Sequence, residues 1–177
     1  MKKFIGTLKE TEGLWLRAYR PEDCAAIIKW IKGDRSHALW CANLLPYPLD
    51  EAGFERVRAE GEQKWGSSSF AVTTADGELA GYFRMNIDSH DNSAFLGFII
   101  INDGMRGKGY GIKMLRLIKE YAFSVAGVEK IRLRVFDVNE AAVHCYERAG
   151  FTAIEHEPEA FLFHSEKWGR YVMEAYR

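Results

Sequence analysis

The sequence is poor in cysteine, has no long apolar run and carries almost no net charge, and each shortage excludes a class of protein. Cys24, Cys41 and Cys145 are widely spaced and form no CxxC pair, so we expect neither a disulfide framework nor a zinc site. No stretch approaches the roughly 18 apolar residues of a membrane helix, and residues 1–10 contain no apolar leader core. The formal net charge of -1 argues against a nucleic-acid partner. These shortages predict a cytoplasmic protein without a metal or a membrane partner.

Apolar and aromatic side chains are plentiful. The 177 residues are 47% hydrophobic and 14% aromatic, which is enough for one well-filled core. No internal repeat or low-complexity stretch divides the chain. We therefore expect a single domain over residues 1–177.

The first part of the chain predicts a strand, two helices and a long loop between the helices. The strand alternates apolar and polar residues, Pro21 opens the first helix and Asp50 caps the second. In chain order, the strand, first helix, loop and second helix are residues 14–19, 21–32, 34–48 and 50–63. Loops of this length often bind ligands, although packing over the core also explains Trp40 in this loop.

The rest of the chain predicts an antiparallel meander followed by a crossover. Asp76 and Gly77 give a strong hairpin signal between two strands, and a third strand follows. A helix whose apolar stripe ends at Val125 connects the third strand to a fourth, which makes those two strands parallel. The predicted strands are residues 70–74, 79–87, 94–101, 131–135, 151–155 and 170–176, and the predicted helices are residues 112–125 and 139–149.

A glycine-rich turn lies between the third meander strand and the crossover helix. It consists of Arg106, Gly107, Lys108, Gly109, Tyr110 and Gly111. Alternating glycines let a ligand approach the backbone, and the free N–H groups of the following helix attract an anion such as phosphate. Two common phosphate loops do not fit, because Asn102 and Ile112 stand where a Walker A loop and a dinucleotide loop, respectively, need glycine. Taken alone, the turn is also explained as a basic surface loop.

A second group of residues lies on the helix predicted over residues 139–149. Asn139 and Tyr146 are seven residues apart, almost two helical turns, so both project from one face that could run along an extended ligand. Taken singly, Asn139 is explained as a helix cap and Tyr146 as a core aromatic.

Together, the Arg-x-x-Gly-x-Gly turn and the helix from Asn139 through Tyr146 to its ending at Gly150 and Phe151 resemble the GNAT superfamily of N-acetyltransferases. The resemblance implies an α/β fold with a mixed sheet of about seven strands, an antiparallel N-terminal meander, a central parallel pair and about four helices. Residues 16–23 are similar to the branch that contains ribosomal-protein N-acetyltransferases.

The resemblance implies that an acetyl group moves from acetyl-coenzyme A to a primary amine by direct attack. The glycine turn would bind pyrophosphate, and Asn139 would also contact the cofactor. Backbone groups of Ile99 and Ile101 would pair with the pantetheine arm, and one of these N–H groups would polarise the thioester carbonyl. Tyr146 would be the general acid for the departing thiolate, since a tyrosine hydroxyl keeps its proton at neutral pH. Cys145 is then a packed side chain rather than a nucleophile.

The general base is where the sequence departs from the family. Phe95 stands where many relatives carry a glutamate. Glu155, His156 and Glu157 are candidates by position alone, and a water chain or a neutral amine would remove the need for a base. The alternative function is therefore a catalytically silent module that binds acyl-coenzyme A.

By the same resemblance, the amine acceptor would lie between residues 34–48 and the connection at residues 156–169. The aromatic residues of these segments are Trp40, Tyr47, Phe161, Phe163 and Trp168. The second segment sets three glutamates against one lysine, namely Glu157, Glu159 and Glu166 against Lys167. This balance favours a cationic acceptor such as a polyamine, an aminoglycoside or a peptide amino terminus. A homodimer is a separate prediction.

Overall fold

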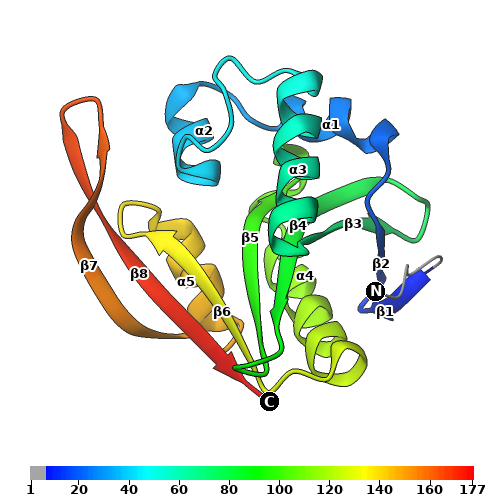
Figure 1. The fold of residues 1–177 in the computed structure, drawn as a ribbon. Coiled ribbons are helices and arrows are strands. Elements are labelled where there is room, and N and C mark those ends of the chain that lie inside the picture. Colours follow the sequence, from blue (N-terminus) through cyan, green and yellow to red (C-terminus); the bar gives the residue numbers. More distant parts are fainter. Residues whose placement is uncertain (1–6) are drawn as a thin grey trace.

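A mixed sheet of eight strands runs through residues 7–177, the part of the chain that this computed structural model describes (Figure 1). The strands are β1 (Thr7–Thr11), β2 (Leu14–Ala18), β3 (Ser68–Thr74), β4 (Leu79–Asp88), β5 (Ser93–Ile101), β6 (Lys130–Phe136), β7 (Thr152–Phe163) and β8 (Glu166–Tyr176). Their order is β1-β2-β3-β4-β5-β6-β8-β7, with β5 and β6 parallel and the other neighbours antiparallel. Residues 1–6 of the predicted domain, which begin the stretch searched for a leader, lie outside the described residues.

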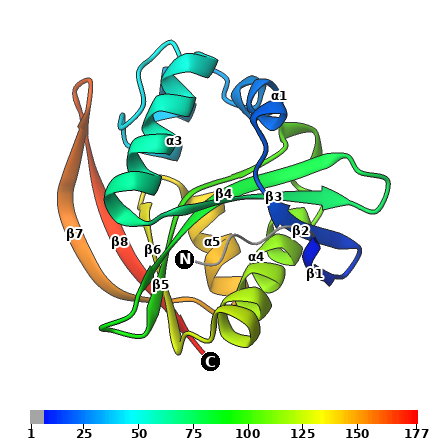
Figure 2. The same cartoon turned by 45° about the vertical axis from the view of Figure 1, so that its right-hand side comes forward.

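Helices cover both faces of the sheet (Figure 1, Figure 2). One face carries α1 (Cys24–Lys29), α2 (Asp34–Cys41) and α3 (Glu51–Trp65), and the other carries α4 (Tyr110–Glu120) and α5 (Glu140–Arg148). Side chains of α4 and α5 pack with the central strands in one apolar cluster. Those of α1 and α3 pack on β4 and β5 in a second cluster, and α2 reaches the β7–β8 hairpin in a third. No helix of the described chain is long and apolar enough to cross a membrane.

The parallel strands β5 and β6 pair at one end and diverge at the other. Their register ends at Leu96 and Leu133. Directly afterwards β5 bulges against β4, and Phe98 takes a φ of 52°. Before the bulge, the even-numbered Leu96 faces α4. The bulge inserts one extra residue, so after it the odd-numbered Ile99 and Ile101 face α4 instead. Beyond the bulge, the β6 side of β5 is therefore an edge without a strand neighbour.

The predicted fold class is confirmed. β3, β4 and β5 form the antiparallel meander, and α4 connects the parallel pair. The Asp50 carboxylate caps α3 by accepting from the Gly53 N–H at 2.7 Å, and Gly150 follows α5 with a φ of 87°. The described chain has eight strands and five α-helices, whereas about seven strands and about four helices were predicted.

The N-terminal part holds a strand and a helix that the sequence did not predict. β1 is short and carries a single apolar residue, which is too few for an alternating pattern. The prediction of a loop at residues 34–48 is wrong over its first half, which forms α2. The buried face of α2 consists of His37, Ala38 and Cys41, so polar residues take part in the stripe that usually marks a helix. Burial lowers the pKa of His37, which favours the neutral ring beside the Cys41 thiol.

The C-terminal part differs from prediction in two places. α4 continues as a wider π-helical turn over Tyr121–Ala126, which leaves Val125 45% exposed rather than buried. The prediction of a connection at residues 156–169 is also wrong, because these residues form most of the β7–β8 hairpin. Much of β7 is exposed on both faces, so apolar alternation does not mark it.

Candidate active site

The diverging ends of β5 and β6 open into a cleft of about 610 Å³. Its walls come from both faces of the sheet, with α2 on one side and α4 and α5 on the other. The predicted site residues that line it are Ile99, Ile101, Arg106, Gly107, Gly109, Gly111, Asn139 and Tyr146, whereas Lys108 and Tyr110 lie outside the lining. The structure thus brings together residues from three separate sequence segments in a space of small-molecule size.

The glycine turn forms one end of the cleft. Gly107 and Gly109 have φ of 74° and 84°, a region that favours glycine, and a Cβ on either would meet nothing within 4 Å. Gly109 is the N-cap of α4, and no side chain of residues 7–177 caps this helix. The first N–H groups of α4 therefore lack intrahelical acceptors, and the open backbone around them fits an anion.

The basic side chains of the turn are bonded to backbone carbonyls. Arg106 donates to the carbonyl oxygens of Ile101 and Trp30, each at 3.3 Å. Lys108 Nζ donates to the carbonyl oxygen of Gly104 at 2.8 Å. Arg106 thereby braces the turn against β5, and the backbone N–H groups are left as the donors that face an anion.

Two residues of α5 supply the opposite wall. Asn139 is the N-cap of α5, where its Oδ1 accepts from the Ala142 N–H at 3.4 Å, and it also lines the cleft. Tyr146 is 9% exposed, and burial raises its pKa well above the ordinary value, so the hydroxyl stays protonated. No described residue hydrogen-bonds this hydroxyl, which leaves its proton available to a ligand.

Close approach of α4 and α5 depends on Gly111. A Cβ at this position would lie 3.0 Å from the Sγ of Cys145, tighter than an ordinary contact. Burial raises the pKa of the Cys145 thiol, which keeps the thiol protonated and a poor nucleophile. Cys145 therefore packs between the two helices, as its partly buried place beside the core indicates.

The α2 side of the cleft is aromatic and basic. Trp40 meets Phe98 edge to face, with ring centroids 5.6 Å apart, and both line the cleft. Arg134 of β6 lines it too, and its guanidinium lies over the Phe95 ring, 5.7 Å from the centroid. Among residues 7–177, no aspartate or glutamate belongs to the lining.

The three candidate general bases lie away from the cleft lining. His156 Nε2 is 3.0 Å from Asp137 Oδ2, and Glu157 accepts from Arg170 Nε at 2.8 Å. Gly169 makes room for the contact between His156 and Asp137, because a Cβ at position 169 would lie 2.2 Å from Asp137 Oδ2. Glu155 is exposed on β7. The structure does not bring these groups together with Tyr146.

The segment predicted to be acidic is neutralised by ion pairs. The pairs are Glu157 with Arg170, Glu159 with Lys167 at 2.9 Å, and Glu166 with Arg35 at 2.7 Å. Arg35 also stacks over Trp168, 5.0 Å from the ring centroid, and thereby joins α2 to the β7–β8 hairpin. The expected negative charge of this segment is therefore cancelled by Lys167 and Arg170 of β8 and by Arg35 from the distant helix α2.

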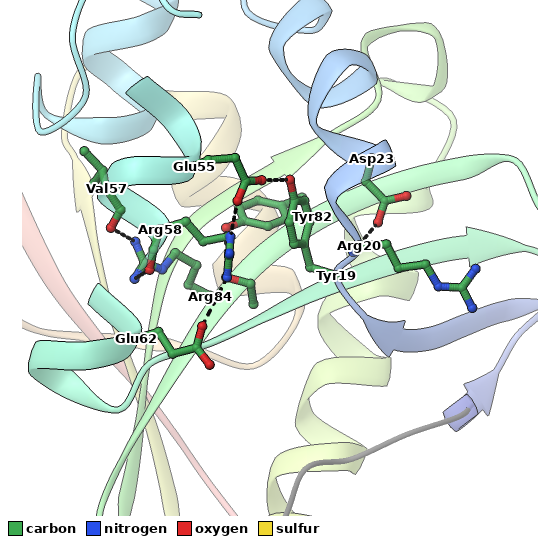
Figure 3. Close-up of polar contacts among 10 residues, drawn as sticks. Tyr19, Arg20, Asp23, Glu55, Val57, Arg58, Glu62, Tyr82 and Arg84 are labelled. Atoms are coloured by element: carbon green, nitrogen blue, oxygen red, sulfur yellow. Dashed lines mark hydrogen bonds and ion pairs between the residues drawn. The ribbon is translucent and has the colours of Figure 1, made fainter. Parts of the chain in front are cut away.

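Arg84 of β4 is a buried arginine without a carboxylate partner in the described chain (Figure 3). It donates to Ser67 Oγ at 2.9 Å and to the carbonyl oxygens of Val57 and Arg58 at 3.4 and 3.3 Å. Its guanidinium also lies 5.0 Å from the centroid of Phe98, at the bulge. Burial lowers its pKa. Arg84 thus ties α3 to the bulge that opens the cleft.

The sequence carried no signal that Arg84 is buried. Alternation along β4 is typical of a strand with one solvent-facing side, and Arg84 falls on the polar side of that pattern. α3 covers this side because position 61 is glycine, where a Cβ would lie 1.7 Å from Nη2 of Arg84. The nearby carboxylates of Glu55 and Glu62 bind Arg58 instead, at 2.9 and 3.2 Å (Figure 3).

Comparisons with known proteins agree with this fold. A sequence model of the Acetyltransferase (GNAT) family matches residues 36–151. The solved structure of spermidine N-acetyltransferase from Vibrio cholerae in complex with CoA and spermine superposes with a TM-score of 0.79. The two are 24% identical, and the match covers 94% of this chain and 96% of that one.

Curated relatives match over shorter stretches. Streptothricin acetyltransferase from Streptomyces lavendulae is 34% identical over 105 residues, which are 59% of this chain and 54% of the relative. Spermidine N(1)-acetyltransferase from Vibrio cholerae is 36% identical over 102 residues, 58% of this chain and 57% of the relative. Its counterpart from Escherichia coli K12 is 33% identical over 81 residues, which are 46% of this chain and 44% of the relative. The match thus spans about half the length of these relatives.

Proposed function

Because the chain belongs to the GNAT acetyltransferase family, we propose that it transfers an acetyl group from acetyl-coenzyme A to a primary amine of a small molecule. One observation carries the proposal: a single cleft joins an uncapped, glycine-rich helix start to the unpaired edge of β5 and to the free hydroxyl of Tyr146. Its opposite end opens beside α2, where an acceptor can enter.

The residues of the cleft fit acetyl-coenzyme A. The backbone of Gly107, Gly109 and Gly111 would hold the pyrophosphate, and the edge of β5 at Ile99 and Ile101 would hold the pantetheine arm as an added strand. Asn139 would contact the cofactor from the facing wall; Lys108 and Tyr110 stay predicted contacts beside the turn. The bound cofactor supplies the acetyl group as an activated thioester.

The chain's own groups act on the reacting atoms without a covalent enzyme intermediate. A backbone N–H group of β5 beyond the bulge donates to the carbonyl oxygen under attack. Tyr146 gives its hydroxyl proton to the departing sulfur, and its raised pKa keeps it loaded with that proton at neutral pH. Cys145 takes no part, since its thiol is protonated and packed between helices.

The positive charge around the cleft favours a neutral amine. Arg134 and the buried Arg84 both lie on the side from which the acceptor enters, and a nearby cation disfavours the ammonium form. The amine therefore reaches the thioester after losing its proton to solvent, which removes the need for the carboxylate that Phe95 replaces. The rate should accordingly rise with pH until the bound amine is deprotonated.

The names of the relatives support a small-molecule acceptor, since they act on spermidine or streptothricin. A cytoplasmic location and a homodimer stay predictions. The alternative, a silent module that binds acyl-coenzyme A, predicts the same cofactor contacts without turnover.

The test is a thermal shift with acetyl-coenzyme A, followed by a thiol-release assay across a panel of amines. We expect the cofactor to raise the melting temperature and at least one amine to release coenzyme A. Stabilisation without turnover on any amine favours the silent module, and no stabilisation contradicts both functions.

A further inference from the structure

Within residues 7–177, the charged side chains that line the cleft are all basic. Arg106 and Arg148 lie toward α4 and α5, and Arg134 lies toward α2. A polyamine is a poor match for such a lining, because its ammonium groups would enter a positive field without a carboxylate partner. An acceptor that carries a negative charge is a better match.

Arg134 is an exposed arginine on the α2 side of the sheet and has no ion pair in the described chain; Arg84, which also lacks one, is buried under α3. Arg132, two residues earlier on β6, binds Glu174 through its Nε at 2.8 Å. Arg170, on the adjacent strand β8, binds Glu157. Arg134 lies opposite Val172 and is exposed, with its guanidinium over the Phe95 ring.

The position of Arg134 separates it from the phosphate end of the cleft. It follows Leu133, the last residue in register with β5, so it stands where the two strands begin to part. The glycine turn follows the far end of β5, beyond Ile101. Arg134 is therefore near the opening between the strands, on the acceptor side. A planar guanidinium held over an aromatic ring is well suited to bind a carboxylate through two parallel hydrogen bonds.

We propose that the acceptor is a small amine that also carries a carboxylate, such as a free amino acid, and that Arg134 binds this carboxylate. The inference rests on the proposed function. Trp40 and Phe98 would contact the apolar part of the acceptor, which points its amine at the gap between β5 and β6. The C–N bond forms as the C–S bond breaks, the sulfur takes the Tyr146 proton, and the proton lost by the nitrogen restores Tyr146 through solvent.

Matched pairs of amines test the inference. Phenylalanine and 2-phenylethylamine, and lysine and cadaverine, differ by the carboxylate, and spermidine serves as the polyamine. We expect kcat/KM to be at least about tenfold higher for the carboxylate-bearing member of each pair, equivalent to about 1.4 kcal/mol. Arg134→Gln should abolish this preference by raising KM, and Arg134→Lys should retain part of it.

Binding measurements provide a second readout and a matched control. Calorimetry in the presence of coenzyme A should show phenylalanine binding to the wild type and weaker binding to Arg134→Gln. Arg170→Gln removes an arginine of the same face that is already paired, and it should keep the preference. A preference for spermidine over both amino acids, failure of both amino acids to bind or react, or an unchanged preference in Arg134→Gln would overturn the inference. Failure of the wild type to bind acetyl-coenzyme A would overturn the proposed function instead.

Discussion

The two ends of the cleft are built in different ways. The glycine turn and the edge of β5 are a continuous stretch of chain that offers backbone groups, with side chains stripped away at alternate positions. The proposed acceptor end is assembled from α2, the bulge of β5 and β6, and it offers side chains; α2 in turn packs on the β7–β8 hairpin. A backbone site suits a ligand common to a whole family, whereas a side-chain site can change its preference by single substitutions.

Charge differs between the two ends as well. At the glycine turn, Arg106 and Lys108 are bonded to backbone carbonyls, and uncapped N–H groups are left to face the ligand. At the proposed acceptor end, Arg132 and Arg170 are paired with carboxylates, the buried Arg84 donates to Ser67 and to backbone carbonyls, and the exposed Arg134 has no ion pair in the described chain. On the proposed function, the first end would recognise an anion through its backbone geometry and the second through the exposed, unpaired Arg134.

Replacing Tyr146, which lies between the two ends, should have the largest effect. We expect Tyr146→Phe to lower kcat by about 100-fold or more, because a general acid contributes on that scale, with little change in the Kd for acetyl-coenzyme A. Steady-state kinetics and calorimetry measure the two quantities. Tyr176→Phe, at an exposed tyrosine near the C-terminus, should leave kcat within about twofold. An unchanged kcat in Tyr146→Phe would remove this residue from the chemistry.

Replacing Trp168 should weaken the acceptor end. The side chain is fully buried between α2 and the hairpin, so Trp168→Ala should lower the free energy of unfolding by about 3–5 kcal/mol. Provided the variant is assayed below its lower melting temperature, KM for the amine should rise and the Kd for acetyl-coenzyme A should stay the same. Trp65→Ala, at a site 63% exposed, should cost within about 0.5 kcal/mol in a denaturant titration. Equal losses in the two variants would contradict this account of the acceptor wall.

Replacing Gly109 should weaken the cofactor end. Gly109→Ala and Gly77→Ala place a Cβ in open space at similar positive φ, 84° and 88°, so each should lose about 1 kcal/mol of stability. Acetyl-coenzyme A binding should weaken several-fold in Gly109→Ala alone, since Gly77 lies in the β3–β4 turn. Calorimetry compares the two, and equal Kd values would mean that the turn does not hold the phosphates.

Removing the carboxylate of Glu174, with which Arg132 pairs, should have the smallest effect, and its effect on stability should depend on pH. Burial alone would raise the pKa of Glu174, but hydrogen bonds from Tyr176 and Arg132 outweigh burial and hold this pKa below its usual range. A carboxyl with a depressed pKa in the folded state stabilises the fold above its unfolded pKa of about 4.3, and this contribution is lost as pH falls through the folded value. Glu174→Gln should therefore cost about 1 kcal/mol at pH 7, and this difference should shrink as the pH falls below about 4.3. Denaturant titrations at several pH values measure the difference in free energy of unfolding between the wild type and Glu174→Gln. A difference that does not depend on pH would contradict this pairing.

The sequence predicted which residues meet at the glycine-turn end of the cleft, because its signals are local. Glycine spacing, the apolar strand before the turn and the Asn139 to Tyr146 spacing lie within short windows, and the structure places most of these residues on one cleft. The meander and the parallel crossover follow from apolar periodicity and the hairpin turn for the same reason. The binding roles of these residues stay predictions.

The acceptor end could not be predicted in this way. α2 was missed because His37 and Cys41 occupy its buried face, and the pattern along β4 does not show that Arg84 is buried, because Gly61, which lets α3 cover it, lies on another element. The expected acidity of residues 156–169 disappeared once Arg35 and Arg170 were placed beside the glutamates. These outcomes depend on how the elements pack and pair in space, which residue patterns do not report.

A crystal structure of the protein with bound coenzyme A tests the central claim most directly. We expect pyrophosphate on the backbone of residues 107–111, pantetheine along β5 at Ile99 and Ile101, and the sulfur within hydrogen-bond reach of the Tyr146 hydroxyl. Arg134 should stay unoccupied by the cofactor, on the acceptor side of the sulfur. Phosphate oxygens on Arg134, or a sulfur remote from Tyr146, would contradict the division of the cleft into a cofactor end and an acceptor end.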